Sequence, residues 1–298
     1  MSAIITDQLR ILNATNFVSV ANSTDKSLYA FIGLPNPTDY KSDWDFSPPV
    51  PKDSFEQEND YWDTMIALKK ITSGDVRQVI RKLQWTSGDT YDMYRHDISR
   101  TNVAQPSGST SLYGANYYVL TQDYRIYVCL QNGTNPENPQ GRPSLDEPTF
   151  TDLEPKSAGT SNDGYIWKYL YTVKPADIIK FDAVEFIPVP LNWTRNTENA
   201  EVRDNAATSG QIKIVTIKNR GIALGAPNRT YTNVPIKGDG TGAECTIVVN
   251  NDSKVDSITV SNGGSGYTHG RIDLVGGGVP TGSTTPLFDV IIPPKGGH

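Results

Sequence analysis

Cysteine, methionine and histidine are scarce in this chain. Among 298 residues there are 2 Cys, 3 Met and 3 His. Cys129 and Cys245 lie in separate apolar runs, so we predict two buried thiols and no disulfide framework. The three histidines, His96, His269 and His298, are far apart in the sequence and have no cysteine beside them, which argues against a zinc site.

Signals for membrane insertion, export and catalysis are also missing. No run approaches the roughly 18 consecutive apolar residues that a membrane helix needs, and residues 1–12 lack the basic and apolar regions of a signal peptide. No motif of a serine hydrolase, zinc protease, P-loop or EF-hand occurs. The glycine clusters at 238–242 and 263–266 precede strand-like runs rather than helices, which favours turns over phosphate cradles. We predict no catalytic residue, no metal and no cofactor.

The charge balance excludes a further class. The formal net charge is −6, and no basic run occurs. Proteins that bind nucleic acid need clustered Lys and Arg to neutralise phosphates, so we expect no nucleic-acid partner. A glycan-cleaving enzyme would need two carboxylates roughly 5 to 10 Å apart, and no pair stands out in the sequence.

Glycine and proline, by contrast, are plentiful, with 25 and 20 residues. They predict many turns and loops, and therefore a mostly β architecture with long connections. We predict an α+β, mostly β fold, with a sheet-based domain that carries a short helical pair. The length allows one large or two ordinary domains.

The one long stretch with helical periodicity is residues 61–83. Apolar residues recur at steps of three and four, which predicts helices over 61–71 and 76–83. Residues 72–75 (TSGD) interrupt the run and have the side chains to cap the second helix. Two interpretations stay open: a helical pair covering the core of a β-rich domain, or a pair whose aromatic exit loop meets a partner protein.

Elsewhere the pattern predicts short strands and long connections. A helix is expected over 6–13. The expected strands are 27–34, 117–120, 124–130, 164–173 and the proline-interrupted 186–193. Residues 35–55 and 131–163 are expected to be loops, the second long enough to be either a binding loop or disordered.

The composition shifts near residue 200. From 211 to 292 there is no tryptophan and no helical pattern, and the run 213–221 (KIVTIKNRG) resembles 255–264 (VDSITVSNGG). A Tyr-Thr pair and a short apolar run follow each copy, which indicates a small all-β domain with an internal repeat. We predict a β-rich domain over 1–200, with helices near 60–84, and an inserted β-repeat domain over 201–292. Residues 293–298 are expected to be the start of a return segment or a truncation.

Aromatic residues are concentrated before residue 200. Tyr and Trp suit interfaces because one end of the side chain is apolar and the other can form hydrogen bonds. We predict interface roles for Trp44, Phe46, Trp85, Tyr91 and Tyr94.

The second domain offers an alternative function. Tyr231 and Tyr267 lie beside polar glycine-rich loops and could contact a glycan, which would make the chain a carbohydrate-binding tail or adhesion protein. Glycan binding requires these rings to be exposed in a shallow groove.

Six sequence blocks, in this order, resemble a known family. They are FIGLP (31–35), SPPVPKDS (47–54), YWDTMIALKKI (61–71), VIRKLQWTSGDTYDMY (79–94), YRIYVCL (124–130) and DGYIWKYLYTVKPAD (163–177). Together they are similar to the dimer-forming baseplate wedge subunit of T-even-like contractile-tailed bacteriophages. The resemblance covers roughly residues 25–195, and residues 201–292 have no counterpart in the compact relatives.

The resemblance implies a structural virion protein without enzymatic activity, located in the tail baseplate and assembled in the host cytoplasm. It implies three kinds of partner: a second copy of the chain in a dimer, other baseplate wedge proteins, and fibre-attachment proteins.

Overall fold

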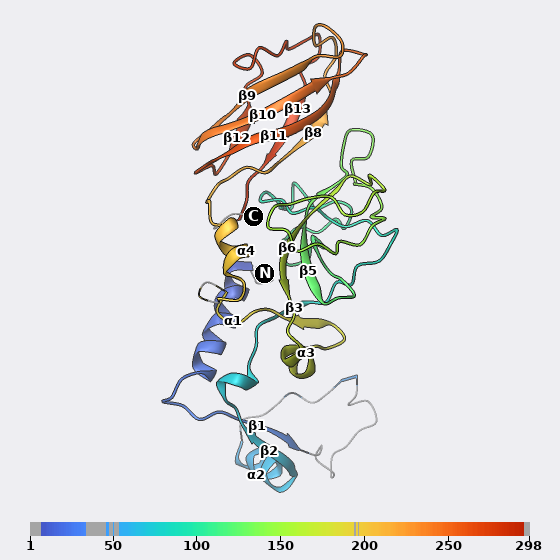
Figure 1. The fold of residues 1–298 in the computed structure, drawn as a ribbon. Helices are drawn as coiled ribbons and strands as arrows, with labels where there is room; N and C mark the ends of the chain where they lie inside the picture. The colour runs from blue at the N-terminus through green and yellow to red at the C-terminus, as the bar shows by residue number, and fades with distance from the viewer. Residues whose placement is uncertain are drawn as a thin grey trace. The chain divides into compact units, whose positions relative to one another are not determined.

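The computed structural model describes residues 7–33, 46–47, 50, 54–193, 195 and 197–294. The chain divides into two compact units, Met1–Gln78 and Val79–His298. The helices and strands carry the labels of Figure 1.

The first unit consists of two helices and a two-stranded ribbon. Its elements are α1 (Asp7–Ala21), β1 (Tyr29–Gly33), α2 (Phe55–Asp63), β2 (Met65–Lys70) and a 3₁₀ turn (Ser73–Asp75). Strands β1 and β2 are antiparallel, with Tyr29 opposite Lys70 and a register shift at Gly33. The helix expected over 6–13 is therefore present but continues to Ala21, and the strand expected over 27–34 is confirmed.

The helical pair expected near 60–84 is wrong. Within 60–84 only residues 60–63 are α-helical, as the end of α2, and Met65–Lys70 and β3 (Val79–Arg81) are strands. A short apolar run fits a helix and a strand equally well by spacing. The choice is made by pairing with β1, whose residues are more than 30 positions away, so no local pattern reveals it. The predicted cap does form, but Thr72 and Asp75 close the 3₁₀ turn rather than start a helix.

The first half of the second unit is built on a three-stranded antiparallel sheet. The strand order is β4 (Tyr118–Leu120), β5 (Arg125–Asn132) and β6 (Tyr165–Thr172). Beside it, β3 pairs with β7 (Phe186–Pro188), and α3 (Pro175–Phe181) lies between β6 and β7 in the chain. The strands expected over 117–120, 124–130 and 164–173 are confirmed.

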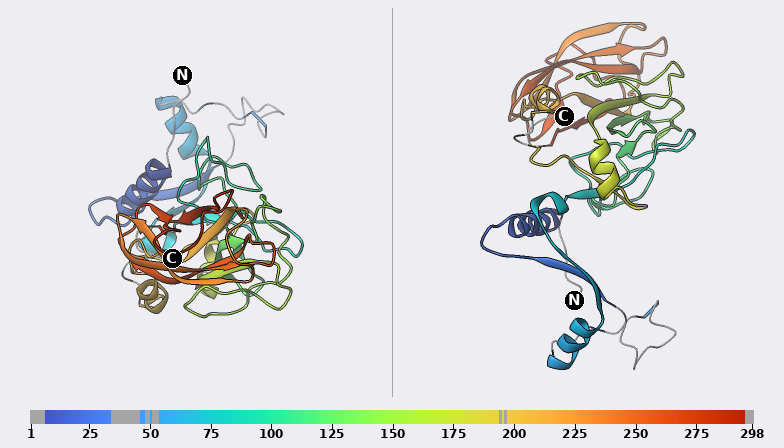
Figure 2. Two further views of the ribbon diagram at one scale, coloured as in Figure 1. Left: turned by 90° about the horizontal axis from the view of Figure 1, so that it is seen from above. Right: turned by 60° about the horizontal axis from the view of Figure 1, so that its bottom comes forward.

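An aromatic core packs against this sheet. Tyr127, Tyr165 and Trp167 are fully buried, and Tyr165 stacks on Trp167 with ring centroids 5.2 Å apart. Strand β5 is buried at five consecutive positions, from Ile126 to Leu130, so both faces of this strand are covered. The cover comes from the long connections, which Figure 2 shows as green loops around the strands.

The second half of this unit is a two-layer β-structure. Its elements are α4 (Ala200–Asn205), β8 (Ile214–Asn219), β9 (Thr230–Gly238), β10 (Thr241–Val249), β11 (Val255–Ser265), β12 (Gly270–Ile272) and β13 (Leu287–Ile291). One sheet has the order β11–β10–β9–β12, and the other pairs β13 with β8. Their shared core includes Ile236, Cys245 and Ile247 from the first sheet, and Val215 and Val290 from the second.

The internal repeat corresponds to real strands. The two similar runs form β8 and β11, and the two apolar runs that follow them contain Ile236 and Ile272, which pair across β9 and β12. Both cysteines are buried and unpaired, as predicted. The α+β, mostly β class is confirmed, while the domain boundary near residue 200 lies inside the second unit and stays a prediction.

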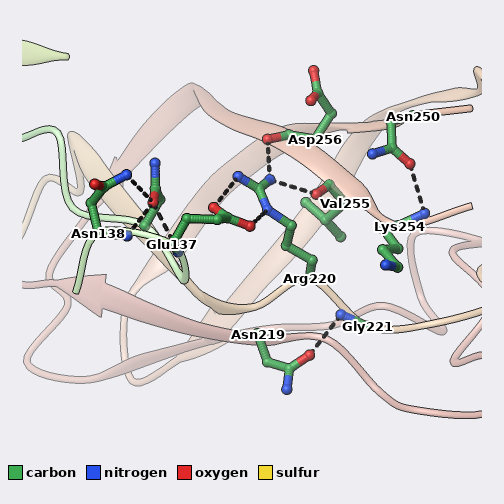
Figure 3. A network of polar contacts seen from close by, with 10 residues as sticks. Glu137, Asn138, Asn219, Arg220, Gly221, Asn250, Lys254, Val255 and Asp256 are labelled. Atoms are coloured by element: carbon green, nitrogen blue, oxygen red, sulfur yellow. Dashed lines mark hydrogen bonds and ion pairs between the residues drawn. The ribbon is translucent and has the colours of Figure 1, made fainter. Parts of the chain in front are cut away.

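The two halves of this unit are joined by strand ends and by ion pairs. Ile214 and Ile291, opposite each other on β8 and β13, belong to the aromatic core of the first half. Arg220 reaches Glu137 in the long loop of the first half, as Figure 3 shows. The apolar and polar contacts together hold both halves in one compact unit.

Candidate protein-protein interface

The first unit exposes its large apolar side chains. More than half of the exposed large hydrophobic residues described in the chain precede residue 79, although this unit is about a quarter of the sequence. The most exposed are Phe46, Phe55, Val50, Trp62, Ile32, Ile11, Ile66 and Phe17. A contiguous set of such residues marks an interaction surface more often than a free one.

This unit also lacks a core of its own. In the described part of residues 7–78, Ala21 is the only buried residue. Ordering each residue costs roughly 1–2 kcal/mol of backbone entropy, and burying one large apolar side chain returns only about 1.5–3 kcal/mol. A unit that leaves those side chains in water recovers little of this cost.

The ribbon and α2 contribute many of the exposed apolar side chains. All five residues of β1 and five of the six in β2 are exposed. In the described residues, neither outer edge of the ribbon pairs with another strand, and an isolated two-stranded ribbon is marginal in water. The rings of Phe31 and Tyr61, from β1 and α2, lie 6.1 Å apart and connect the ribbon to the helix. Trp62, next on α2, is 70% exposed.

The predicted interface residues that the structure describes differ in exposure. Phe46 is 93% exposed, and Trp44 lies outside the described residues. Trp85 is partly buried, and its indole nitrogen donates to Ser144 Oγ at 3.1 Å. Tyr91 and Tyr94 are core residues, which corrects their expected exposure on a loop.

The core positions of the two tyrosines have a physical cause. The Tyr91 ring packs edge-on against Trp167 at 5.9 Å, and its hydroxyl accepts the backbone N–H of Thr86 at 2.6 Å. Burial raises the pKa of Tyr91 and raises that of Tyr94 to about 12. A loop without regular structure still buries its aromatic side chains when it covers the face of a sheet.

The two tyrosines proposed for a glycan are likewise not displayed together. Tyr267 is 3% exposed, and its hydroxyl donates to Ile236 O at 2.9 Å and accepts the N–H of Ala243 at 3.2 Å. Tyr231 is partly buried, with the guanidinium of Arg229 over its ring. The exposed aromatic groove that glycan binding requires is not formed by this pair.

The sequence pattern did not indicate the exposed residues of the ribbon. Ile66 and Leu68 alternate with Ala67 and Lys69, a period of two that fits a strand, but the helical steps of the surrounding run concealed it. A metal site or a membrane span would be an alternative functional feature. In the described residues, no group of His, Cys, Asp and Glu could hold a metal ion, and no helix is long and apolar enough to span a membrane.

An apolar ribbon without a core of its own, attached to a well-packed β unit, is typical of a subunit in a larger assembly. The family model for Gp8 of bacteriophage T4 matches residues 3–154, about half of the chain, including the exposed surface. The baseplate wedge protein gp8 of Enterobacteria phage T4 is 27% identical over 215 residues. That match covers 63% of this chain and 60% of the relative.

The chain belongs to this Gp8 family, and the resemblance to baseplate wedge subunits is confirmed. The chain matches less than two thirds of the length of the curated relative.

Proposed function

We propose that this protein is a structural subunit of a baseplate wedge in the tail of a phage virion, and that the first unit is its association element. The observation that carries the proposal is the set of exposed apolar side chains in the first unit, among whose described residues only Ala21 is buried. This surface lies inside the region shared with the family. The role is mechanical attachment to neighbouring proteins rather than catalysis.

A second copy of the chain is the first partner we assign to this surface. Homodimers are most often two-fold symmetric, with the same patch on both copies. The free edges of the ribbon can pair in an antiparallel fashion across such an axis, which satisfies their backbone groups. A stable dimer of this kind should bury more than about 1,000 Å² in total.

Other wedge proteins and fibre-attachment proteins are the further partners. Helix α2 (FEQENDYWD) contains four acidic residues and no basic residue, beside the exposed rings of Phe55 and Trp62. The surface that receives it should therefore be apolar at its centre and basic at its rim. In the assembled baseplate the second unit would move as a rigid body, because its two halves share a core.

Matched substitutions test the proposal. We expect Trp62→Asp and Ile66→Asp to weaken self-association at least tenfold, because each places a charge in the buried centre of the interface. Ile179→Asp and Val184→Asp are the controls, since these residues are even more exposed than Trp62 and Ile66 but belong to the second unit. Size-exclusion chromatography with light scattering, over a range of concentrations, measures the dimer.

Two results would count against the proposal. A wild-type chain that stays monomeric at high concentration, and also fails to join reconstituted wedge proteins, would show that the surface has no partner. Equal effects of the ribbon variants and the control variants would show that association does not use the first unit.

A further inference from the structure

The second unit contains a lysine that is completely shielded from solvent. Lys168 lies in the middle of β6 and is 0% exposed. Its amine donates to the backbone carbonyl of Leu153, and to Oδ1 of Asn205 at 2.6 Å. No carboxylate forms an ion pair with it in the described part of the chain. Burial without an ion-pair partner disfavours the charged form of a lysine and lowers its pKa.

The asparagine beside it is held on its other side by a carboxylate. Asn205 is the last residue of α4, and its Nδ2 donates to Oε1 of Glu154 at 2.8 Å. The second oxygen of Glu154 accepts from Lys213 Nζ at 2.7 Å. An amine, a side-chain amide and a carboxylate therefore lie in sequence, each within hydrogen-bond distance of the next.

We propose that Lys168 and Asn205 form an intramolecular isopeptide bond, with Glu154 as the proton carrier. The lone pair of Lys168 Nζ attacks Cγ of Asn205, and a C–N bond forms. The bond from Cγ to Nδ2 then breaks, and Nδ2 leaves as ammonia after it receives one proton from the attacking amine. Atoms and charge balance: an amine and a primary amide give a secondary amide and ammonia, with no oxidant, reductant or cofactor.

The surroundings favour each part of this step. Burial, together with the nearby charge of Lys213, lowers the pKa of Lys168 to about 8, so a larger fraction of this amine is neutral near neutral pH than for an exposed lysine. The hydrogen bonds from Lys213 and Asn205 lower the pKa of Glu154, so its carboxylate is ionised and holds a transferred proton only briefly before passing it to the leaving nitrogen. Reactants fixed in contact react faster than reactants free in solution, because the entropy of bringing them together is already lost in the fold.

The leaving group also has an exit. Glu154 and Lys213 line an open cavity of about 270 Å³, and the Glu154 side chain is 67% exposed. Ammonia released beside Glu154 can reach solvent through this opening, which makes the reaction irreversible in dilute solution. The amine, in contrast, stays buried on β6, where water cannot compete with it for the amide.

The bond would tie β6 to α4, the helix that leads into the second β-structure. It would close a covalent ring over residues 168–205. The connection between the two halves of the unit would then resist being pulled apart. This chemistry does not depend on the assembly role, although a subunit that transmits force would gain from it.

Mass spectrometry of the intact, denatured protein tests the proposal. We expect the wild-type mass to fall below the sequence value by one ammonia molecule. Lys168→Met and Asn205→Ala should both have their full sequence masses, and Glu154→Gln should remain largely unlinked. Lys174→Met is the control, because it removes an exposed lysine near the end of the same strand and should keep the deficit.

Digestion with trypsin identifies the atoms that are joined. We expect one branched peptide that joins residues 204–213 to the segment around Lys168. Circular dichroism of each variant shows whether it still folds. A wild-type chain with its full sequence mass and two separate peptides overturns the proposal, and a deficit that survives Glu154→Gln overturns the role of Glu154.

Discussion

The ion pair between Arg220 and Glu137 allows a quantitative test of how the second unit is held together. The Nε–H and Nη2–H groups of Arg220 donate hydrogen bonds to the two oxygens of Glu137, at 2.7 and 2.9 Å. Its remaining nitrogen, Nη1, donates to the carbonyls of Val255 and Asp256 at 2.7 and 2.8 Å. All three sides of the guanidinium are therefore used, as Figure 3 shows.

Removing Glu137 and removing Arg220 should lower the free energy of unfolding by different amounts. The Glu137 side chain is 57% exposed, so Glu137→Gln loses a solvent-screened attraction and should cost about 0.5 kcal/mol of unfolding free energy. Arg220 is only 22% exposed. Arg220→Met leaves two carbonyls at the start of β11 without their charged donor, and should cost about 2 kcal/mol.

Urea denaturation of the wild type, both single variants and the double variant measures these costs. The double variant should cost about as much as Arg220→Met alone, because the contribution of Glu137 depends on Arg220. Arg220 lowers the pKa of Glu137, so the contribution of Glu137 is present above the pKa of the unfolded carboxyl and is lost as pH falls through the lower folded value. A loss for Glu137→Gln equal to that for Arg220→Met would refute the reasoning.

Three further predictions concern buried or hydrogen-bonded groups. Tyr267→Phe removes a hydroxyl that bonds two buried backbone groups, and should cost about 1–3 kcal/mol in denaturation, while Tyr231→Phe should cost less than about 0.5 kcal/mol. Cys129 and Cys245 should react with a thiol reagent only at the rate of unfolding, because burial raises both pKa values; rapid reaction of the native protein would contradict this. Thr268 lowers the pKa of Asp239 through its hydroxyl and its backbone N–H. The stability from this interaction is lost as pH falls through the lowered pKa, so Asp239→Asn should lose less stability than the wild type when the pH is lowered.

The strands of the second unit could be predicted from the sequence because their signals are local. Residues 164–173 combine β-branched and aromatic residues over a length that suits a strand, and they form β6. The two similar runs near 213 and 255 were recognisable as a repeat because each contains a strand and its turn. The burial of both cysteines followed from the apolar residues around them.

The exposure of the aromatic residues could not be predicted in this way. Tyr91 and Trp62 lie in segments of similar composition, yet the first is 6% exposed and the second 70% exposed. The difference arises because the loop of Tyr91 covers a sheet formed by residues 118–172, whereas α2 touches a two-stranded ribbon whose residues are themselves largely exposed. Composition gives the same expectation for both residues, and only the packing partner separates them.

The sequence alone determined the family, the mostly β class and the positions of most strands, because these depend on the order and local chemistry of neighbouring residues. The tertiary structure decided that residues 65–70 form a strand and that the apolar surface belongs to the first unit. It also decided that Lys168, Glu154 and Asn205 meet. These residues are separated by 14 to 51 positions, and side chains that distant in sequence become neighbours only when the sheet and the helix pack together.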